Sequence, residues 1–185
     1  GDDCVVFRQK PQVESQYICS IAGAAAIASG RSHRRPPAWK TDLRALFMGL
    51  EPQGDPEPLG NAHFGNGGMS VLVDEQTMLV FDHGPLGFHS TAGHGHADAL
   101  SLWLHYRGQP IWVDWGIHRY NGVPLEREWA RSTAAHNTIV INDTSQSQTA
   151  GPFNWSNRAQ VRVLTCDIGQ GRLSAEHNGY HNVIH

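Results

Sequence analysis

The sequence has 185 residues, of which 39% are hydrophobic and 17% are charged. This balance is typical of a folded globular protein and excludes an intrinsically disordered chain. A net charge of −3 argues against the broad basic surface that nucleic-acid binding requires. No apolar run approaches the ~20 residues of a membrane-spanning helix. We therefore expect no nucleic acid and no membrane as a partner.

The first part of the chain is predicted to be helical. Residues 14–30 are rich in alanine and end at Gly30, which is a common helix terminator. Residues 39–50 carry apolar side chains at helical spacing. Residues 51–59 contain three prolines and one glycine, so they are interpreted as a linker.

Short apolar runs separated by turn residues follow the linker, a pattern typical of an antiparallel β-sandwich. The first two runs form a predicted hairpin around residues 74–76. We expect residues 1–57 to be a helical segment with its linker and residues 58–185 to be the β-domain. Strands are expected at 70–73, 78–81, 99–106, 111–113, 136–142, 160–164 and 172–177.

The three cysteines, Cys4, Cys19 and Cys166, are widely separated, and none lies in a C-x-x-C motif. A zinc site built from thiolates is therefore not expected. An odd number of cysteines allows one disulfide at most, so the cysteines leave the redox compartment open.

Twelve histidines are an unusually large number for a chain of this length, and the segment 93–98 is the most informative group. If the segment is extended, His94, His96 and Asp98 share one face, because side chains two apart on a strand point the same way. The glycines beside them allow another part of the chain to approach the backbone closely.

Two further residues of ligand type lie at predicted strand ends. Asp114 follows the apolar run 111–113, and His136 begins the run 136–142. Two histidines and a carboxylate suit Zn²⁺ with an open fourth position, and they also suit non-haem iron. A set of hydrogen-bonded histidines in a turn is the alternative without a metal.

Two metal-binding folds fit the pattern less well. A cupin requires a glutamate three or four residues after His96, where Ala99 and Leu100 stand. An iron- and oxoglutarate-dependent oxygenase would use His96, Asp98 and His136 as a facial triad. It would also need an arginine about ten residues after the second histidine, and residues 143–153 contain none.

A third interpretation accounts for more of the chain. The run HGHADALSLWLHYRGQPIWVDWGIHRYNG, followed by REWARSTAAHNTIVIN, closely resembles the β-domain of heparinase II/III-like polysaccharide lyases. The resemblance spans about residues 83–142, with weaker similarity around residues 146–155 and 176–180. Several separate motifs occur in the family's order, which makes the resemblance specific.

The resemblance implies a role for each matching residue. His96, Asp114 and His136 match the family's zinc ligands, and that zinc is a structural one. His94 matches a histidine that is catalytic or that neighbours the substrate, and we take it as a catalytic candidate. Arg119 matches an arginine that contacts the substrate in alginate lyase relatives.

Tyr120, as a catalytic residue, and Arg131, as a substrate-binding one, are further candidates in the expected cleft. A solvated or structural role is the alternative for Arg131. The family's other catalytic groups lie mainly on a helical toroid domain, of which residues 1–57 resemble the end. We therefore expect this domain of the same protein as a partner, and we expect the 185-residue chain alone to be inactive or nearly so.

The implied activity is β-elimination on an acidic, uronate-containing polysaccharide such as alginate or heparin. Such a lyase must neutralise a carboxylate, remove a proton and protonate a leaving oxygen, which arginine, histidine and tyrosine can do. A periplasmic or secreted location is inferred from this substrate class. The alternative from another functional class is a non-catalytic carbohydrate-binding module that a metal stabilises.

Overall fold

The structure is a computed structural model that divides near residue 60 into two compact units, a helical one and a β-rich one. No helix among the described residues is long and apolar enough to cross a membrane. Of residues 11–18 only the backbone is described. The structure describes residues 11–36, 39–58, 60–88, 91–114, 116 and 123–183.

The helical unit contains α1 (Pro11–Ala28), a 3₁₀ turn (Ser32–Arg34) and the short α2 (Leu43–Phe47). The prediction for residues 39–50 was too long, because α2 starts only after Asp42. The Asp42 carboxylate accepts a hydrogen bond from the Ala45 amide at 3.0 Å and so caps the helix there.

The predicted linker is held to the 3₁₀ turn of the same unit. Ser32 Oγ accepts a hydrogen bond from the Gln53 amide at 2.7 Å, and Arg35 donates one to the Gly54 carbonyl at 2.6 Å. The segment 51–58 has no regular secondary structure, but these two hydrogen bonds connect it to the 3₁₀ turn.

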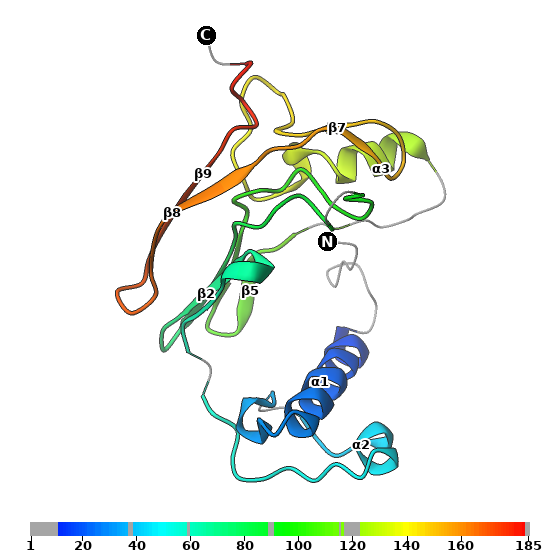
Figure 1. The fold of residues 1–185 in the computed structure, drawn as a ribbon, viewed down its shortest axis with the longest axis vertical. Coiled ribbons are helices and arrows are strands. Elements are labelled where there is room, and N and C mark those ends of the chain that lie inside the picture. Colours follow the sequence, from blue (N-terminus) through cyan, green and yellow to red (C-terminus); the bar gives the residue numbers. More distant parts are fainter. Residues whose placement is uncertain are drawn as a thin grey trace. The chain divides into compact units, whose positions relative to one another are not determined.

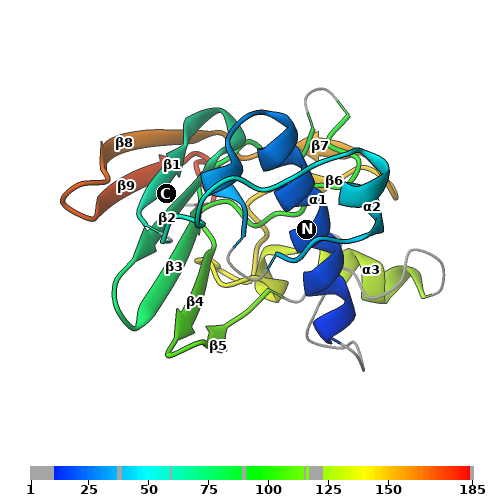
Figure 2. The ribbon, with the colours of Figure 1, turned by 90° about the horizontal axis from the view of Figure 1, so that it is seen from below.

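The β-rich unit is built on a five-stranded antiparallel sheet in the order β1-β2-β3-β4-β5, of which β2 and β5 are labelled in Figure 1. Each strand pairs with the next one along the chain, and in Figure 2 they follow one another across the sheet. The predicted hairpin is confirmed, with Val73 opposite Met78. The strands are β1 (Ala62–Phe64), β2 (Met69–Val73), β3 (Thr77–Asp82), β4 (Leu102–Tyr106) and β5 (Gln109–Trp112).

Two smaller antiparallel pairs and one helix complete this unit. The long hairpin of β8 and β9 corresponds to the last two predicted strands, whereas α3 and the pair β6–β7 were not predicted. The mainly β, antiparallel fold expected from the sequence is thus confirmed. These elements are α3 (Pro124–Ala130), β6 (Gln148–Thr149), β7 (Trp155–Asn157), β8 (Val161–Asp167) and β9 (Arg172–His177).

The predicted strand at 136–142 is wrong. Among these residues only Ile141 makes a β-bridge, a single one to Thr144, and Ile139 is 70% exposed. Asn142 and Asp143 have φ values of 51° and 53°, in the left-handed region, which breaks an extended chain. Residues 136–142 thus form a loop despite their apolar alternation, because tertiary contacts override the local pattern.

Polar side chains fill much of the interior of the β-rich unit. The one apolar cluster of buried residues described there is small and consists of Ala92, Ala97 and Trp155, with Leu86 packed against it. The largest fully buried side chains are instead polar ones, which must be hydrogen-bonded to be stable there. They are Arg131, Gln146, Thr133, Ser70 and Ser101.

Candidate metal centre and its exposed neighbour

Three side chains from separate segments meet at one place. His96 lies in the loop between β3 and β4, Asp114 follows β5, and His136 follows the 3₁₀ turn Thr133–Ala135. One ligand atom from each of the three lies within 4.8 Å of the others. The structure therefore brings together the three residues that the family resemblance implied as metal ligands.

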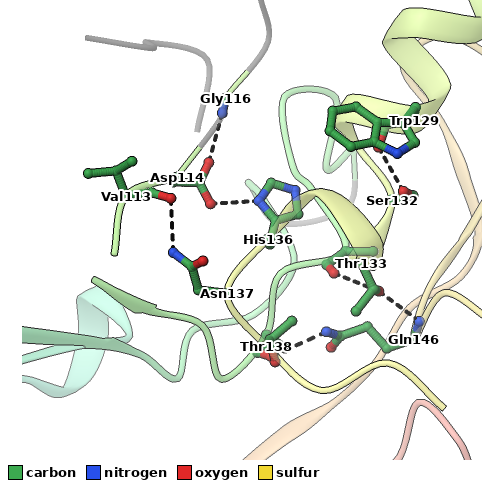
Figure 3. A network of polar contacts seen from close by, with 12 residues as sticks. Val113, Asp114, Gly116, Trp129, Ser132, Thr133, His136, Asn137, Thr138 and Gln146 are labelled. Atoms are coloured by element: carbon green, nitrogen blue, oxygen red, sulfur yellow. Dashed lines mark hydrogen bonds and ion pairs between the residues drawn. The ribbon is translucent and has the colours of Figure 1, made fainter. Parts of the chain in front are cut away.

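A short hydrogen bond joins two members of the group. His136 Nδ1 and Asp114 Oδ2 are 2.6 Å apart, and the His136 side chain is fully buried (Figure 3). The ring of His96 lies 5.1 Å from that of His136, centroid to centroid. Asp114 is fixed further by the Gly116 amide, which donates a hydrogen bond to its other oxygen at 2.8 Å.

The interaction between Asp114 and His136 shifts the pKa of both side chains. Burial by itself would raise the pKa of Asp114, but the hydrogen bond and charge of His136 outweigh it, so this pKa lies below its ordinary value. Burial likewise acts to lower the pKa of His136, and Asp114 reverses this effect and raises it. Each residue thus stabilises the charged form of the other.

Asp98, the carboxylate that local spacing offered as a ligand, is not a member of the group. Burial raises the pKa of Asp98 to about 7, and the nearby carboxylates of Asp82 and Asp114 add to this effect. Burial also raises the pKa of Asp82. The facial triad of an oxygenase, which needs Asp98, is therefore not the arrangement found here.

The group fits a metal ion on chemical grounds. Two imidazoles and one carboxylate are ligands that zinc prefers. His136 turns its Nδ1 toward Asp114 Oδ2, 2.6 Å away, so the donor atoms of these two residues face each other. A cation between these donor atoms would take the place of the proton that this hydrogen bond shares.

His94 lies in a different environment although it is only two residues from His96. His94 is exposed, whereas His96 is 2% exposed. The extended conformation that would place both on one face is not found, because residues 91–100 contain turns and Ala92 and Leu100 have positive φ.

The glycine beside these histidines has the predicted role. A Cβ atom at Gly95 would lie 2.9 Å from the Gly87 backbone nitrogen, so glycine permits the close approach of the two segments. Gly95 and His96 are both buried at this close approach.

Arg131, proposed as a substrate-binding residue, is 1% exposed. It donates hydrogen bonds to the carbonyls of Gly151 and Pro152 at 3.2 and 2.9 Å, and its guanidinium lies 4.6 Å from the centre of the Trp155 ring. These contacts are those of a structural residue, the alternative role that the sequence allowed. Arg119 and Tyr120 lie outside the described residues.

Two polar residues to which the sequence analysis gave no role, Thr133 and Asn137, connect the segments that carry the candidate ligands. Thr133 Oγ1 donates a hydrogen bond to the Ala97 carbonyl at 2.8 Å and accepts one from the Gln146 amide at 3.0 Å. Asn137 donates a hydrogen bond to the Val113 carbonyl at 2.9 Å (Figure 3). The bonds to the Ala97 and Val113 carbonyls tie the residues next to His96 and Asp114 to the segment that carries His136, and no local pattern could reveal such pairs.

Comparison with known proteins places the chain in a family. The heparinase II/III-like, C-terminal family matches residues 56–185. An alginate lyase of Stenotrophomonas maltophilia is 34% identical over 95% of the chain, which spans 23% of that lyase. An exo-oligoalginate lyase of Saccharophagus degradans is 39% identical over 49% of the chain, which spans 14% of it.

Solved structures show the same fold. The heparan sulfate lyase HepC of Pedobacter heparinus superimposes with a TM-score of 0.60 at 16% identity, covering 90% of this chain and 24% of its own. A heparinase III with methylated lysines gives a TM-score of 0.60 at 17% identity over 89% of this chain and 23% of its own. The chain thus spans about a quarter or less of these relatives, and the match over residues 56–185 shows that it belongs to the heparinase II/III-like family.

Proposed function

We propose that this chain is the β-domain of a polysaccharide lyase that acts on uronate-containing polysaccharides by β-elimination. The observation that carries the proposal is the convergence of His96, Asp114 and His136 in a buried centre next to the exposed His94. Relatives named as alginate lyase, exo-oligoalginate lyase and heparin-sulfate lyase support this substrate class.

The metal that we propose for the buried centre is a structural zinc held by His96, Asp114 and His136. Such a zinc would hold together the three loops that carry its ligands and supply positive charge beneath the loop of His94. Its ligand segments are already connected by hydrogen bonds through Asn137 and Thr133.

In the proposed reaction, His94 acts as the base. Its neutral imidazole removes the proton from C5 of the uronate, and the electron pair of that C–H bond becomes the C4–C5 double bond. The C4–O bond then breaks, and its electron pair leaves with the glycosidic oxygen, which takes up a proton. Proton transfers of this kind require groups within hydrogen-bonding reach of the reacting atoms, and an exposed loop histidine can reach them.

The remaining roles in the proposal go to residues outside the described part and to other parts of the protein. Arg119 would bind the substrate carboxylate through paired hydrogen bonds, which stabilises the charge that develops on proton removal. Tyr120 would protonate the leaving oxygen. A helical toroid domain of the same protein would supply further catalytic groups, and a periplasmic or secreted location follows from the extracellular origin of the substrate.

The test uses the full-length gene product and this 185-residue chain side by side. Metal content is measured by elemental analysis, and activity on alginate and heparan sulfate is followed through the ultraviolet absorbance of the unsaturated uronate product. We expect about one zinc per chain in both proteins and activity only in the full-length one. His96→Ala should lose the zinc, and His94→Gln should keep the zinc but lose activity.

Each of the other possible outcomes would favour a different interpretation. Iron in place of zinc would support an oxygenase-type centre, and a folded protein without metal would overturn the ligand assignment. Zinc with binding of the polysaccharide but no unsaturated product from the full-length protein would favour a non-catalytic carbohydrate-binding module.

A further inference from the structure

Phe153 is a large aromatic side chain that is fixed in place although it is not part of the core. It is 46% exposed and lies in the turn between β6 and β7. Hydrogen bonds across the turn, from the Ala150 amide to the Asn154 carbonyl at 2.8 Å and from the Asn154 amide to the Gly151 carbonyl at 3.4 Å, close it into a compact loop.

Two arginines of one helical segment hold this turn. Arg131 donates hydrogen bonds to the carbonyls of Gly151 and Pro152, and Arg127 donates one to the Pro152 carbonyl at 2.6 Å. The guanidinium of Arg127 also lies 4.2 Å from the centre of the Phe153 ring, in cation–π contact. The orientation of Phe153 is therefore fixed by specific contacts and not by burial.

The same turn is anchored to the loop of His94. Trp155 Nε1 donates a hydrogen bond to the Ala92 carbonyl at 3.1 Å, inside the buried apolar cluster. The Phe153 ring lies 5.9 Å from the ring of His94, centroid to centroid, with an angle of 57° between the ring planes. An exposed aromatic ring thus stands in a fixed position directly beside the exposed imidazole.

We propose that Phe153 is a substrate-binding residue whose ring packs against a sugar ring next to the bond that is cleaved. This inference rests on the proposed function, because the substrate class is taken from it. The C–H face of a pyranose is apolar, and an aromatic ring that is already fixed binds it without loss of side-chain conformational freedom. Arg127 and Arg131 are positioning residues that hold the ring toward His94.

The experiment measures binding without turnover, in the full-length protein carrying His94→Gln. The probe is a saturated mannuronate oligosaccharide, and its Kd is determined by calorimetry. We expect Phe153→Ala to weaken binding by about two- to tenfold, the effect of losing one aromatic contact. Phe153→Trp should restore binding, because any aromatic ring can serve as the packing surface.

The matched control is Phe64→Ala, which removes a phenylalanine of β1 that is 57% exposed. Its Kd should equal that of the protein without this change. Melting temperature and zinc content of every variant are measured in parallel, and both should stay unchanged in Phe153→Ala, which shows that the folded centre is intact.

Kinetics with an intact His94 separate this inference from the proposed function. An increase in KM with little change in kcat supports packing against the substrate, whereas a decrease in kcat alone overturns it and makes Phe153 a support for His94. Full activity with unchanged KM in Phe153→Ala also overturns it while the lyase assignment stands. Binding that depends on Phe153 without any cleavage by the wild type would leave the packing role valid and overturn the lyase.

Discussion

His94 and His96 are separated by a single residue, yet they belong to two regions built in opposite ways. His96 is 2% exposed and lies in a buried group with Asp114 and His136, whereas His94 is exposed beside the Phe153 ring. A turn, not a strand, places the two imidazoles in these different surroundings. Burial suits a histidine that holds structure, and exposure suits one that must reach a polymer.

The two regions also differ in what fixes them. The buried group is held by hydrogen bonds between distant segments, such as those of Thr133 and Asn137. The exposed region is held by Arg127 and Arg131 through the carbonyls of one turn. Mutations in the first region should therefore affect folding and metal content. In the second region, mutation of Phe153 should affect binding of the substrate, and mutation of the buried Arg131 should affect folding without loss of the metal.

The largest effect is expected for His136→Ala. This change removes a proposed zinc ligand and leaves the partly buried Asp114 carboxylate without its 2.6 Å partner. Zinc content should fall to near zero, and the free energy of unfolding should fall by more than about 3 kcal/mol. Elemental analysis and urea unfolding measure the two quantities.

His181→Ala is the control for this change, because His181 is an exposed histidine of the same unit. It should leave both quantities unchanged. If a chelator lowers the stability of His136→Ala as much as that of the wild type, His136 is not a ligand of the stabilising metal.

Arg131→Met changes a buried residue that holds the turn of Phe153, and it is expected to have the next largest effect on the free energy of unfolding. The change removes the two hydrogen bonds that Arg131 donates to the carbonyls of Gly151 and Pro152, and it removes a charged side chain that is 1% exposed. The free energy of unfolding should fall by about 2–4 kcal/mol, while zinc is retained. Urea unfolding and elemental analysis give the result.

Arg162→Met is the matched control, because the Arg162 side chain is 72% exposed and pairs with Glu176 on the surface. An exposed ion pair contributes at most about 1 kcal/mol. Equal losses in the two variants would mean that Arg131 does not hold the turn.

The sequence alone predicted those parts of the fold that depend on local pattern. The hairpin of β2 and β3 follows from two apolar runs around Asp74, and the β8–β9 pair follows similarly. Residues 136–142 have an equally good strand pattern and form no strand. A backbone hydrogen bond joins the Leu102 amide of β4 to the Asn137 carbonyl at 3.1 Å, but the positive φ of Asn142 breaks the extended chain, and the side chains of Asn137 and Thr138 bond to other segments. Local alternation does not contain that information.

In the candidate site, too, local pattern predicted only part of what the structure shows. Local spacing offered His94, His96 and Asp98 as a set, and only His96 belongs to the group that the structure assembles. Asp114 and His136 were offered as ligand-type residues at predicted strand ends, and the ordered motifs of the family resemblance then implied them as zinc ligands. Phe153 lay in the weaker part of that resemblance, and its place beside His94 depends on a contact between residues far apart in sequence.

Thr133→Val should have a smaller effect than either change above. Valine has the same shape as threonine but lacks the hydroxyl that donates to the Ala97 carbonyl and accepts from the Gln146 amide. Since Thr133 is 0% exposed, water cannot replace these bonds, and we expect a loss of about 1–3 kcal/mol in urea unfolding. Thr165→Val, at an exposed position of β8, is the control and should change stability by less than about 0.5 kcal/mol.

The smallest expected effect is a change of the free energy of unfolding with pH that arises from His177, at the end of β9. Burial lowers the pKa of His177 below its ordinary value of 6.5, and its Nδ1 accepts a hydrogen bond from the Gly179 amide at 3.1 Å. Protonation abolishes this acceptor. Between pH 6.5 and the lowered folded-state pKa, the unfolded chain binds more protons than the folded one, so stability falls as pH falls through this window.

Replacing the imidazole removes this contribution. The loss of unfolding free energy between pH 7.5 and pH 5.5 should be smaller in His177→Gln than in the wild type, by less than about 0.5 kcal/mol because the site is partly solvated. Urea unfolding at both pH values measures the difference, with His181→Gln as the exposed control. A steeper acid dependence in His177→Gln would show that the protonated imidazole is stabilised in the fold, opposite to the direction that its burial implies.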